Sequence, residues 1–229
     1  MTRRAAAVLL TGPPAVGGAP PGVDPAAFAR AMAEDVIDLL TELAAVEPFV
    51  IASAGRAAEA RSLAWSADQV LVAPAATATN STRSPVPGMS TPPGTSTGVL
   101  GVLDVLRDRG VEEIALVTAD APDLPGLMVA KTFGALRSAP VAVAPARGGG
   151  AVVVACRLSV PAWLAAVGID LDVADPVGRL RAAAVRPADV ACTPGWRRLR
   201  QPGDLTALDP GLEGWEATRA LLDGSAARR

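Results

Sequence analysis

Histidine and tyrosine are absent from the 229 residues, and lysine occurs once, as Lys131. Without histidine the chain can form neither a Ser-His-Asp or Cys-His nucleophile system nor a histidine-ligated zinc site. Tyrosine is equally missing as a general acid. Any chemistry must therefore depend on carboxylates, arginines, Lys131, backbone amides or a bound metal ion.

Aromatic residues are also scarce, at 3%, although half of the residues are hydrophobic, so Ala, Val and Leu must build the core. The 21 basic and 23 acidic residues nearly balance, which argues against a nucleic-acid surface. No apolar run approaches the roughly 20 residues that span a bilayer. The apolar stretch Ala5–Leu10 is too short for a typical secretion signal and better fits a first strand. We therefore expect a cytoplasmic protein without membrane association.

Only two cysteines are present, Cys156 and Cys192, and they do not form a Cys-x-x-Cys pair. We interpret them as buried free thiols in a reducing compartment, with one disulfide as the alternative.

Strand and helix patterns alternate along the chain. The expected strands are Ala5–Leu10, Phe49–Ala52, Gln69–Val72, Ile114–Val117, Val141–Pro145 and Ala151–Ala155. Asp24 and Pro25 mark the start of the first helix. The alternation predicts one doubly wound α/β domain over residues 1–229, with a mainly parallel, Rossmann-like sheet and helices on both faces. Ala73–Gly98 is polar and proline-rich without periodicity, and we expect a mobile or disordered loop there.

The most informative segment is Val117–Pro125, where a buried strand ends in Thr-Ala-Asp-Ala-Pro-Asp-Leu-Pro. Prolines bar the continuation of the strand, so Asp120 and Asp123 should lie at the carboxyl end of a central strand, where open α/β sheets bind ligands. A carboxylate there can hold a divalent cation against a substrate phosphate. The alternative is structural, with Asp120 ending the strand and Asp123 capping a helix that starts near Gly126.

The loop after the first strand contains Thr11, Gly12, Gly17 and Gly18, at a position where glycine-rich turns often hold phosphate. Its sequence matches no phosphate-binding fingerprint, and its prolines remove amide donors. A plain connecting loop is the better interpretation, but its position makes it the leading candidate for a nucleotide-binding wall.

A second glycine turn follows Arg147, at Gly148, Gly149 and Gly150. Such glycines allow a tight turn, and they would equally let a substrate lie against the backbone. Arg147 could pair with a phosphate or carboxylate, or remain solvated. The single basic cluster, Trp196–Arg200, could hold an acidic substrate, although such residues more often form an exposed rim.

These motifs, in this order, resemble the GT-A nucleotide-diphosphosugar transferase superfamily. More narrowly, they are similar to a bacterial family of unknown function allied to the molybdenum-cofactor and phospholactate guanylyltransferases. The resemblance rests on Thr118–Pro125, Pro145–Gly150, the late segment Arg198–Leu205 and Ala33–Asp35, and spans roughly residues 5 to 207. It implies that Asp120 binds Mg²⁺ or Mn²⁺ and is catalytic, and that Asp123, Gly148 and Gly149 contact the substrate. Arg147 and Arg200 are further candidates for substrate contact because of their positive charge.

The chain departs from the family pattern at three places. The basic Lys-Thr-Arg-Leu segment of the first loop is replaced by Gly17–Gly22, an acid before the paired glycines is Gly148, and a late Asp-x-Asp is Arg198-Leu-Arg200. The arginines could place positive charge directly on phosphate in place of a metal ligand. These departures predict a weaker, less metal-dependent transferase, or no enzyme.

The leading hypothesis is a GT-A-like nucleotidyl- or glycosyltransferase acting on a nucleoside triphosphate or nucleotide sugar and a small acceptor. The alternative is a degenerate, non-catalytic member that binds a ligand or protein partner. A Rossmann NAD-binding dehydrogenase is disfavoured, because the glycine fingerprint and the ribose-binding acid are missing.

Overall fold

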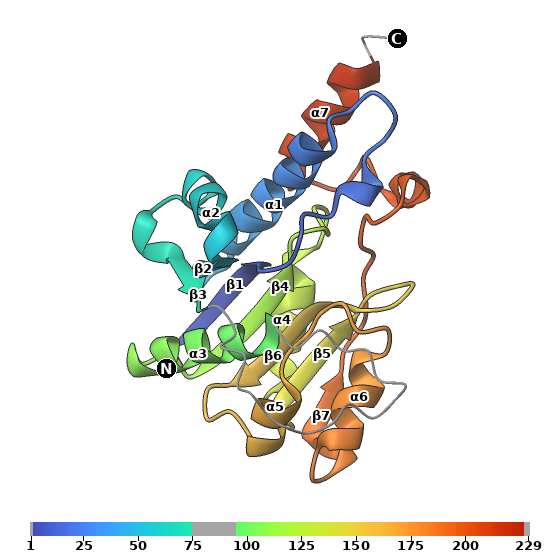
Figure 1. The fold of residues 1–229 in the computed structure, drawn as a ribbon. Helices are drawn as coiled ribbons and strands as arrows, with labels where there is room; N and C mark the ends of the chain where they lie inside the picture. The colour runs from blue at the N-terminus through green and yellow to red at the C-terminus, as the bar shows by residue number, and fades with distance from the viewer. Residues whose placement is uncertain (1, 75–94, 227–229) are drawn as a thin grey trace, which may run out of the picture.

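Seven strands among the described residues form one sheet, and helices cover both of its faces (Figure 1). The computed structural model describes residues 2–74 and 95–226. The strands are β1 (Arg4–Leu10), β2 (Val46–Ser53), β3 (Val70–Ala73), β4 (Glu113–Thr118), β5 (Val141–Pro145), β6 (Ala151–Arg157) and β7 (Val190–Cys192). The α-helices are α1 (Pro25–Glu42), α2 (Ala57–Leu63), α3 (Thr95–Asp108), α4 (Gly126–Ala135), α5 (Ala162–Val167), α6 (Pro176–Ala183) and α7 (Glu216–Ala226).

The spatial order of the strands is β3-β2-β1-β4-β6-β5-β7, which places β4 in the middle. β1 pairs parallel with both β2 and β4, β2 with β3, and β5 with β7. Only β6 runs against its neighbours β4 and β5. The predicted mainly parallel sheet, with the strand before Asp120 central and parallel to the first strand, is therefore confirmed. The two strands predicted before and after the glycine turn correspond to β5 and β6.

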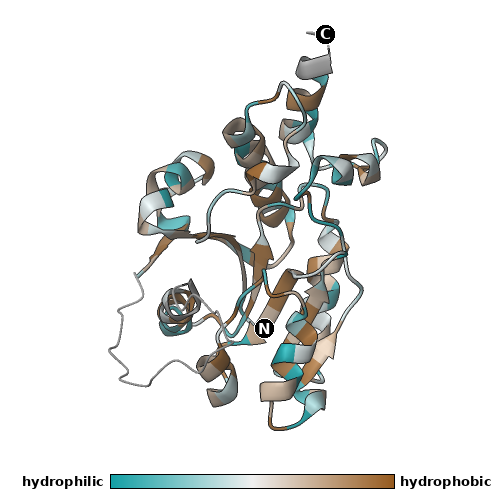
Figure 2. Ribbon diagram, turned by 45° about the vertical axis from the view of Figure 1, so that its right-hand side comes forward, coloured by the Kyte–Doolittle hydropathy of each residue, from teal (hydrophilic) through white to brown (hydrophobic). Residues whose placement is uncertain are grey.

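The sheet separates two apolar layers, as the strand period of two requires. Along β1, Ala6, Val8 and Leu10 point into a cluster formed with α1, α2 and α4. Ala5 and Ala7 point into the opposite cluster, formed with α3, α5 and α6. The strands are accordingly mostly hydrophobic, whereas most helices combine hydrophobic and hydrophilic residues (Figure 2). The small alanine side chains let the helices pack close to the strands.

Several boundaries differ from the sequence-based expectation. β2 begins at Val46 and includes Pro48, which we had placed before the strand. Proline is tolerated there because the β3 ladder begins only at Val50, so that this part of β2 has a neighbour on one side, like an edge strand. β7 was not predicted, since three residues are too few to show periodicity.

The expected loop Ala73–Gly98 is shorter than predicted at both ends. Ala73 belongs to β3, and α3 begins at Thr95 rather than at Val99. The remaining part of the prediction, residues 75–94, lies outside the described residues.

The carboxyl-terminal helix α7 packs beside α1 (Figure 1). Its first turn is held by Asp35 of α1, whose carboxylate accepts hydrogen bonds from the backbone N–H groups of Ala217 (2.8 Å) and Thr218 (2.9 Å). The predicted start of α1 is also confirmed, because the Asp24 carboxylate accepts a hydrogen bond from the backbone N–H of Ala27 at 2.9 Å. The two aspartates thus fix both the start of α1 and the position of α7.

The two cysteines are free but lie in different environments. Cys156 is buried in β6, and burial raises the pKa of its thiol to about 12. Cys192, which we expected to be buried, is exposed, because β7 is an edge strand.

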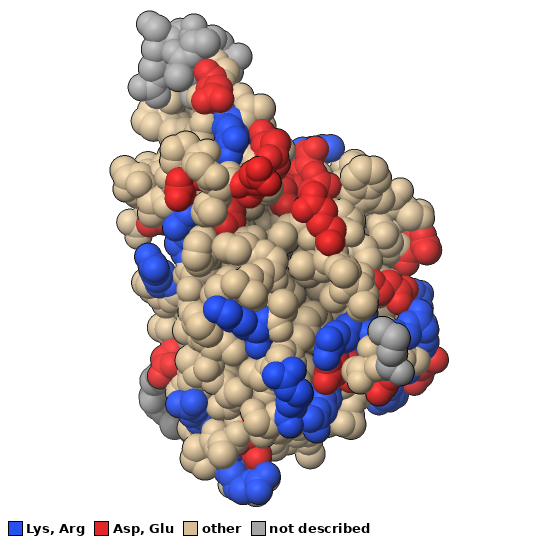
Figure 3. Space-filling model, turned by 180° about the vertical axis from the view of Figure 1, so that it is seen from behind, with Lys and Arg blue, Asp and Glu red and all other residues tan. Residues whose placement is uncertain are grey.

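On the face seen in Figure 3, acidic side chains gather mainly in the upper part, and basic side chains prevail over the middle and lower part. None of the helices in residues 2–74 and 95–226 combines the length and apolarity needed to cross a bilayer.

Candidate functional site

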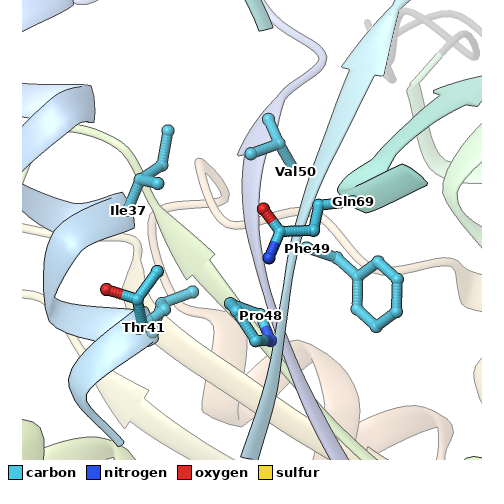
Figure 4. A pocket seen from close by; sticks show the side chains of 7 residues that line it. Ile37, Thr41, Pro48, Phe49, Val50 and Gln69 are labelled. Carbon is cyan, nitrogen blue, oxygen red and sulfur yellow. The ribbon is translucent and has the colours of Figure 1, made fainter. Parts of the chain in front are cut away.

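The carboxyl ends of β1 and β4 open into a cavity of about 470 Å³. This volume is in the range of small-molecule sites. Thr11 and Gly12, which follow β1, and Asp120, which follows β4, all line it. The predicted position of Asp120 beside the first loop is therefore confirmed. Another hollow, between α1 and β2, has a volume of only about 10 Å³, enough for one water molecule (Figure 4).

The wall of the large cavity has an apolar and a charged part. Leu9, Met32, Val99 and Leu100 belong to the apolar part. The charged part consists of Arg56, Arg179, Arg198, Asp120, Asp170 and Asp172. Such a cavity can hold a flat or aliphatic group on one side and an anion on the other.

Asp120 is buried, and the side chains around it occupy both of its carboxylate oxygens. Nε of Arg198 donates to Oδ1 at 2.6 Å and Nη2 donates to Oδ2 at 2.9 Å, so the pair is bidentate. The Thr118 hydroxyl donates to Oδ1 at 2.6 Å, and Nε of Arg200 lies 3.3 Å from Oδ2. The Asp120 and Arg198 side chains are only 4% and 7% exposed. Charge-assisted pairs of this geometry are the strong ones.

The Arg198 guanidinium makes four hydrogen bonds and a further ion pair with Asp172. Besides Asp120, Nη1 donates to the backbone carbonyls of Ala151 (3.2 Å) and Leu171 (2.9 Å), and Nη2 lies 2.9 Å from Oδ1 of Asp172. Arg200 also pairs with Asp172. The expectation that the basic cluster forms an exposed rim is wrong for Arg198, which is a buried link between β4, β6 and the segment before α6.

The residues at this position do not fit a divalent metal ion. Mg²⁺ is held by free carboxylate oxygens, substrate phosphates and water in an octahedral shell. Here the guanidinium of Arg198 fills the space between Asp120 and Asp172, where such an ion would have to lie. Among residues 2–74 and 95–226, no group of three or more His, Cys, Asp or Glu side chains could hold a metal ion.

Asp123 lies outside the cavity wall, and its side chain is fully buried. Its oxygens accept from the indole N–H of Trp196 at 3.1 Å and from Arg197. It does not cap α4, whose N-cap residue is Pro125, so the capping interpretation is wrong. Asp123 instead fastens the segment that carries Arg198, and its predicted contact with substrate stays a prediction.

The glycine turn packs against the guanidinium of Arg198 at Gly150. Gly148, Gly149 and Gly150 have φ angles of 84°, 107° and 88°, in the left-handed region that favours glycine. A Cβ atom on Gly150 would lie 2.7 Å from the Leu171 carbonyl oxygen and 3.1 Å from Nη1 of Arg198. Arg147 is exposed, and neither it nor these glycines line the cavity. The positive φ angles and the close approach at Gly150 explain why glycines occupy this turn. Its predicted contact with substrate stays a prediction.

The first loop divides into two parts. Thr11 and Gly12 line the cavity, and their predicted role as a nucleotide-binding wall stays a prediction. Gly17 and Gly18, in the short 3-10 helix η1 (Val16–Gly18), pack instead against the backbone of residues 199 and 200. A Cβ on Gly18 would meet the Leu199 carbonyl oxygen at 2.5 Å. These two glycines therefore close the loop over the basic segment.

Sequence reasoning missed Arg56 and Arg179. Arg56 ends the 3-10 helix η2 (Ala54–Arg56); it donates to the Gly12 carbonyl at 3.2 Å and pairs with Glu59 at 2.7 Å. The hydrogen bond from Arg56 lowers the pKa of Glu59. Arg179 on α6 donates to the Val167 carbonyl at 2.6 Å and makes no ion pair within the described residues. Neither residue belongs to a recognisable motif, so only the fold reveals them.

Comparisons with known proteins support the fold. No protein-family model and no curated protein matches the sequence. Among solved structures, a protein from Desulfovibrio desulfuricans G20, provisionally assigned as a nucleotide-diphospho-sugar transferase, matches 100% of this chain and 98% of its own at 16% identity, with a TM-score of 0.64.

Two structures of 4-diphosphocytidyl-2C-methyl-D-erythritol synthase are also similar. One covers 97% of this chain and 99% of its own at 17% identity. The other, from Anaerococcus prevotii DSM 20548, covers 96% of each chain at 12% identity. Both have a TM-score of 0.54. The chain thus has the nucleotide-diphospho-sugar transferase type of fold, as the resemblance implied at the level of the superfamily.

Proposed function

We propose that the protein binds a nucleoside triphosphate or a nucleotide sugar in the 470 Å³ cavity and transfers a nucleotidyl or glycosyl group to a small acceptor. The observation that carries this proposal is the cavity's position. It lies at the carboxyl ends of two neighbouring parallel strands, with the first loop as one wall and arginines on others. Sheets of this type bind ligands at that end. The solved structures of similar fold include a protein assigned as a nucleotide-diphospho-sugar transferase and a 4-diphosphocytidyl-2C-methyl-D-erythritol synthase, which also supports the proposal.

Arg179 is the residue best suited to hold a phosphate. Its side-chain hydrogen bond to the Val167 carbonyl uses one N–H of five, and within the described residues it forms no ion pair. Arg56 pairs with Glu59 but still faces the cavity beside Gly12. The apolar wall of Leu9, Met32 and Leu100 suits the base or sugar ring of the same ligand.

Asp120 has a narrower role in this proposal than the sequence implied. Its carboxylate positions Arg198, and through the bond from the Leu199 N–H to the Asp120 carbonyl (2.7 Å) the whole basic segment is fixed at the cavity. The closer kinship to molybdenum-cofactor and phospholactate guanylyltransferases and a cytoplasmic location are parts of the proposal that rest on the sequence. The Mg²⁺ or Mn²⁺ that the resemblance implies is not part of it, because the residues around Asp120 do not fit such an ion.

The second candidate function is ligand binding without catalysis. The specific observation in its favour is that Asp120, the expected catalytic carboxylate, has both oxygens engaged by arginines and by Thr118. A non-catalytic member would bind the nucleotide but release no product.

Isothermal titration of GTP, CTP and UDP-glucose tests the proposal. We expect at least one to bind, and Arg179→Gln to weaken that binding by about tenfold or more, since a charge-assisted hydrogen bond is worth about 1.5–3 kcal/mol. The matched control is Arg181→Gln on the same helix, whose Nε contacts the Val190 carbonyl instead of the cavity. Release of pyrophosphate from the triphosphates on adding sugar phosphates, or of UDP from UDP-glucose on adding small acceptors, then distinguishes the two candidates. Absence of binding by all three nucleotides would contradict both.

A further inference from the structure

Three side chains that line the cavity, Asp120, Asp172 and Arg198, form a charge-balanced group of four with the neighbouring Arg200. Arg198 and Arg200 supply two positive charges, and Asp120 and Asp172 supply two negative ones. Every arginine in the group contacts both aspartates. In a cavity of this kind a divalent cation would usually provide the positive charge that phosphate requires.

We infer that Arg198 is a resident cation in the place of a metal ion, and that phosphate ligands bind in this cavity without any divalent metal. The binding part of this inference rests on the proposed function; the exclusion of metal does not. The guanidinium is flat, permanently charged and bidentate to Asp120, so it performs the charge neutralisation that a bound ion would perform.

Displacing Arg198 would be costly, because its other donors are also committed. The Ala151 and Leu171 carbonyls would each lose a buried hydrogen bond, and the charged side chain would have to leave a nearly closed site. The neighbouring Gly150 leaves no free space, since even a Cβ there would come within 3.1 Å of Nη1. To bind at this position, a metal ion would therefore have to displace the Arg198 guanidinium, which is covalently part of the chain.

Phosphate would not be bound by Arg198 itself, because all three of its nitrogens already donate to Asp120 or to backbone carbonyls and the guanidinium also pairs with Asp172. The anion is attracted instead by Arg179 and Arg56, which face the same cavity from α6 and η2. Arg198 keeps the carboxylates of Asp120 and Asp172 from repelling that anion. Cation substitution and anion binding are thus separate tasks of different arginines, and they can be tested separately.

The first measurement needs no nucleotide. Electron paramagnetic resonance of Mn²⁺ is recorded with the unmodified protein, with Arg198→Ala/Arg200→Ala and with Arg197→Ala. We expect no bound Mn²⁺ in the unmodified protein, and at least about a tenfold gain in Mn²⁺ affinity in the double variant, where two carboxylates lose their partners. Arg197→Ala is the matched control, because it uncovers only Asp123, which keeps its bond from Trp196. Tight Mn²⁺ binding by the unmodified protein would overturn the inference even if the double variant failed to fold.

The second measurement repeats the titrations of GTP, CTP and UDP-glucose in EDTA and in Mg²⁺. We expect the two dissociation constants of the bound nucleotide to agree within about twofold. A loss of about tenfold or more in EDTA would overturn the inference while leaving the proposed function intact. If no nucleotide binds under either condition, the proposed function fails, and the Mn²⁺ measurement alone decides the exclusion of metal.

Discussion

The buried pair of Asp120 and Arg198 predicts a specific effect on stability. Asp120→Asn keeps the shape of the side chain but removes the negative charge, leaving Arg198 buried with the largely exposed Asp172 and two backbone carbonyls. Breaking a buried ion pair from one side typically costs about 3–5 kcal/mol. Because Arg198 keeps these other partners, we expect Asp120→Asn to lower the free energy of unfolding by about 3 kcal/mol, at the lower end of this range.

Urea unfolding in EDTA measures the effect. With a slope of about 1–3 kcal/mol per M, a loss of about 3 kcal/mol lowers the midpoint by about 1 M or more. Asp172→Asn is the control; Asp172 is 67% exposed, and its variant should lose less than about 1 kcal/mol. Arg198→Met added to Asp120→Asn should restore part of the loss, since an uncharged pair needs no neutralisation.

The sign of the result distinguishes two roles for Asp120. If the Asp120 carboxylate serves to bind a metal ion, its negative charge lacks a partner once EDTA removes the metal. Asp120→Asn, which removes that charge, should then leave the free energy of unfolding unchanged or raise it. A carboxylate that neutralises a buried arginine should give the opposite result. If Asp120→Asn is as stable as the unmodified protein in EDTA, the reasoning about Arg198 is wrong.

Two further predictions concern titratable groups away from the cavity. Burial raises the pKa of Asp35 from 3.8 to about 6, so its contribution to stability is fully present below about pH 4 and is lost as the pH rises through about 6. The unfolding free energy of the unmodified protein relative to Asp35→Asn should therefore fall by up to about 3 kcal/mol between about pH 4 and about pH 7, measured by urea unfolding; no change in this difference would contradict the assignment. Cys192 should react quickly with a thiol reagent such as DTNB in the folded protein and Cys156 only after unfolding, as Cys192→Ser should demonstrate by abolishing the fast phase. A rapid reaction of two thiols in the native state would refute this second prediction.

Much of the fold follows from local patterns in the sequence. The run Ile114–Val117 is apolar without interruption because β4 lies in the middle of the sheet with both faces covered. Asp24 and Pro25 define the start of α1 through a cap that depends only on neighbouring residues. The patterns failed where an element is short, as in β7, or where the tolerance of a residue depends on the neighbouring strand, as at Pro48.

The site was only partly predictable, for a physical reason. The carboxyl end of a parallel strand is a binding position in any such sheet, so Asp120 and the first loop could be placed from the sequence. The partner of a charge cannot be found in this way. Arg198 lies 78 residues from Asp120 along the chain, and a basic cluster looks the same in sequence whether it is solvated or buried. Arg179 could be found only once α6 was seen to border the cavity.

The departures from the family resemblance form one connected arrangement in space. Arg198 and Arg200, found where acids were expected, share Asp120 and Asp172, so these changes leave the group neutral. The first loop, which lacks the expected basic segment, receives the guanidinium of Arg56 at Gly12 instead. Positive charge has therefore not been lost from the cavity; it is carried by side chains of η2 and α6 instead of by the loop and a metal ion. Because electrostatic attraction depends on the position of a charge and not on the segment that supplies it, such a site can still attract phosphate.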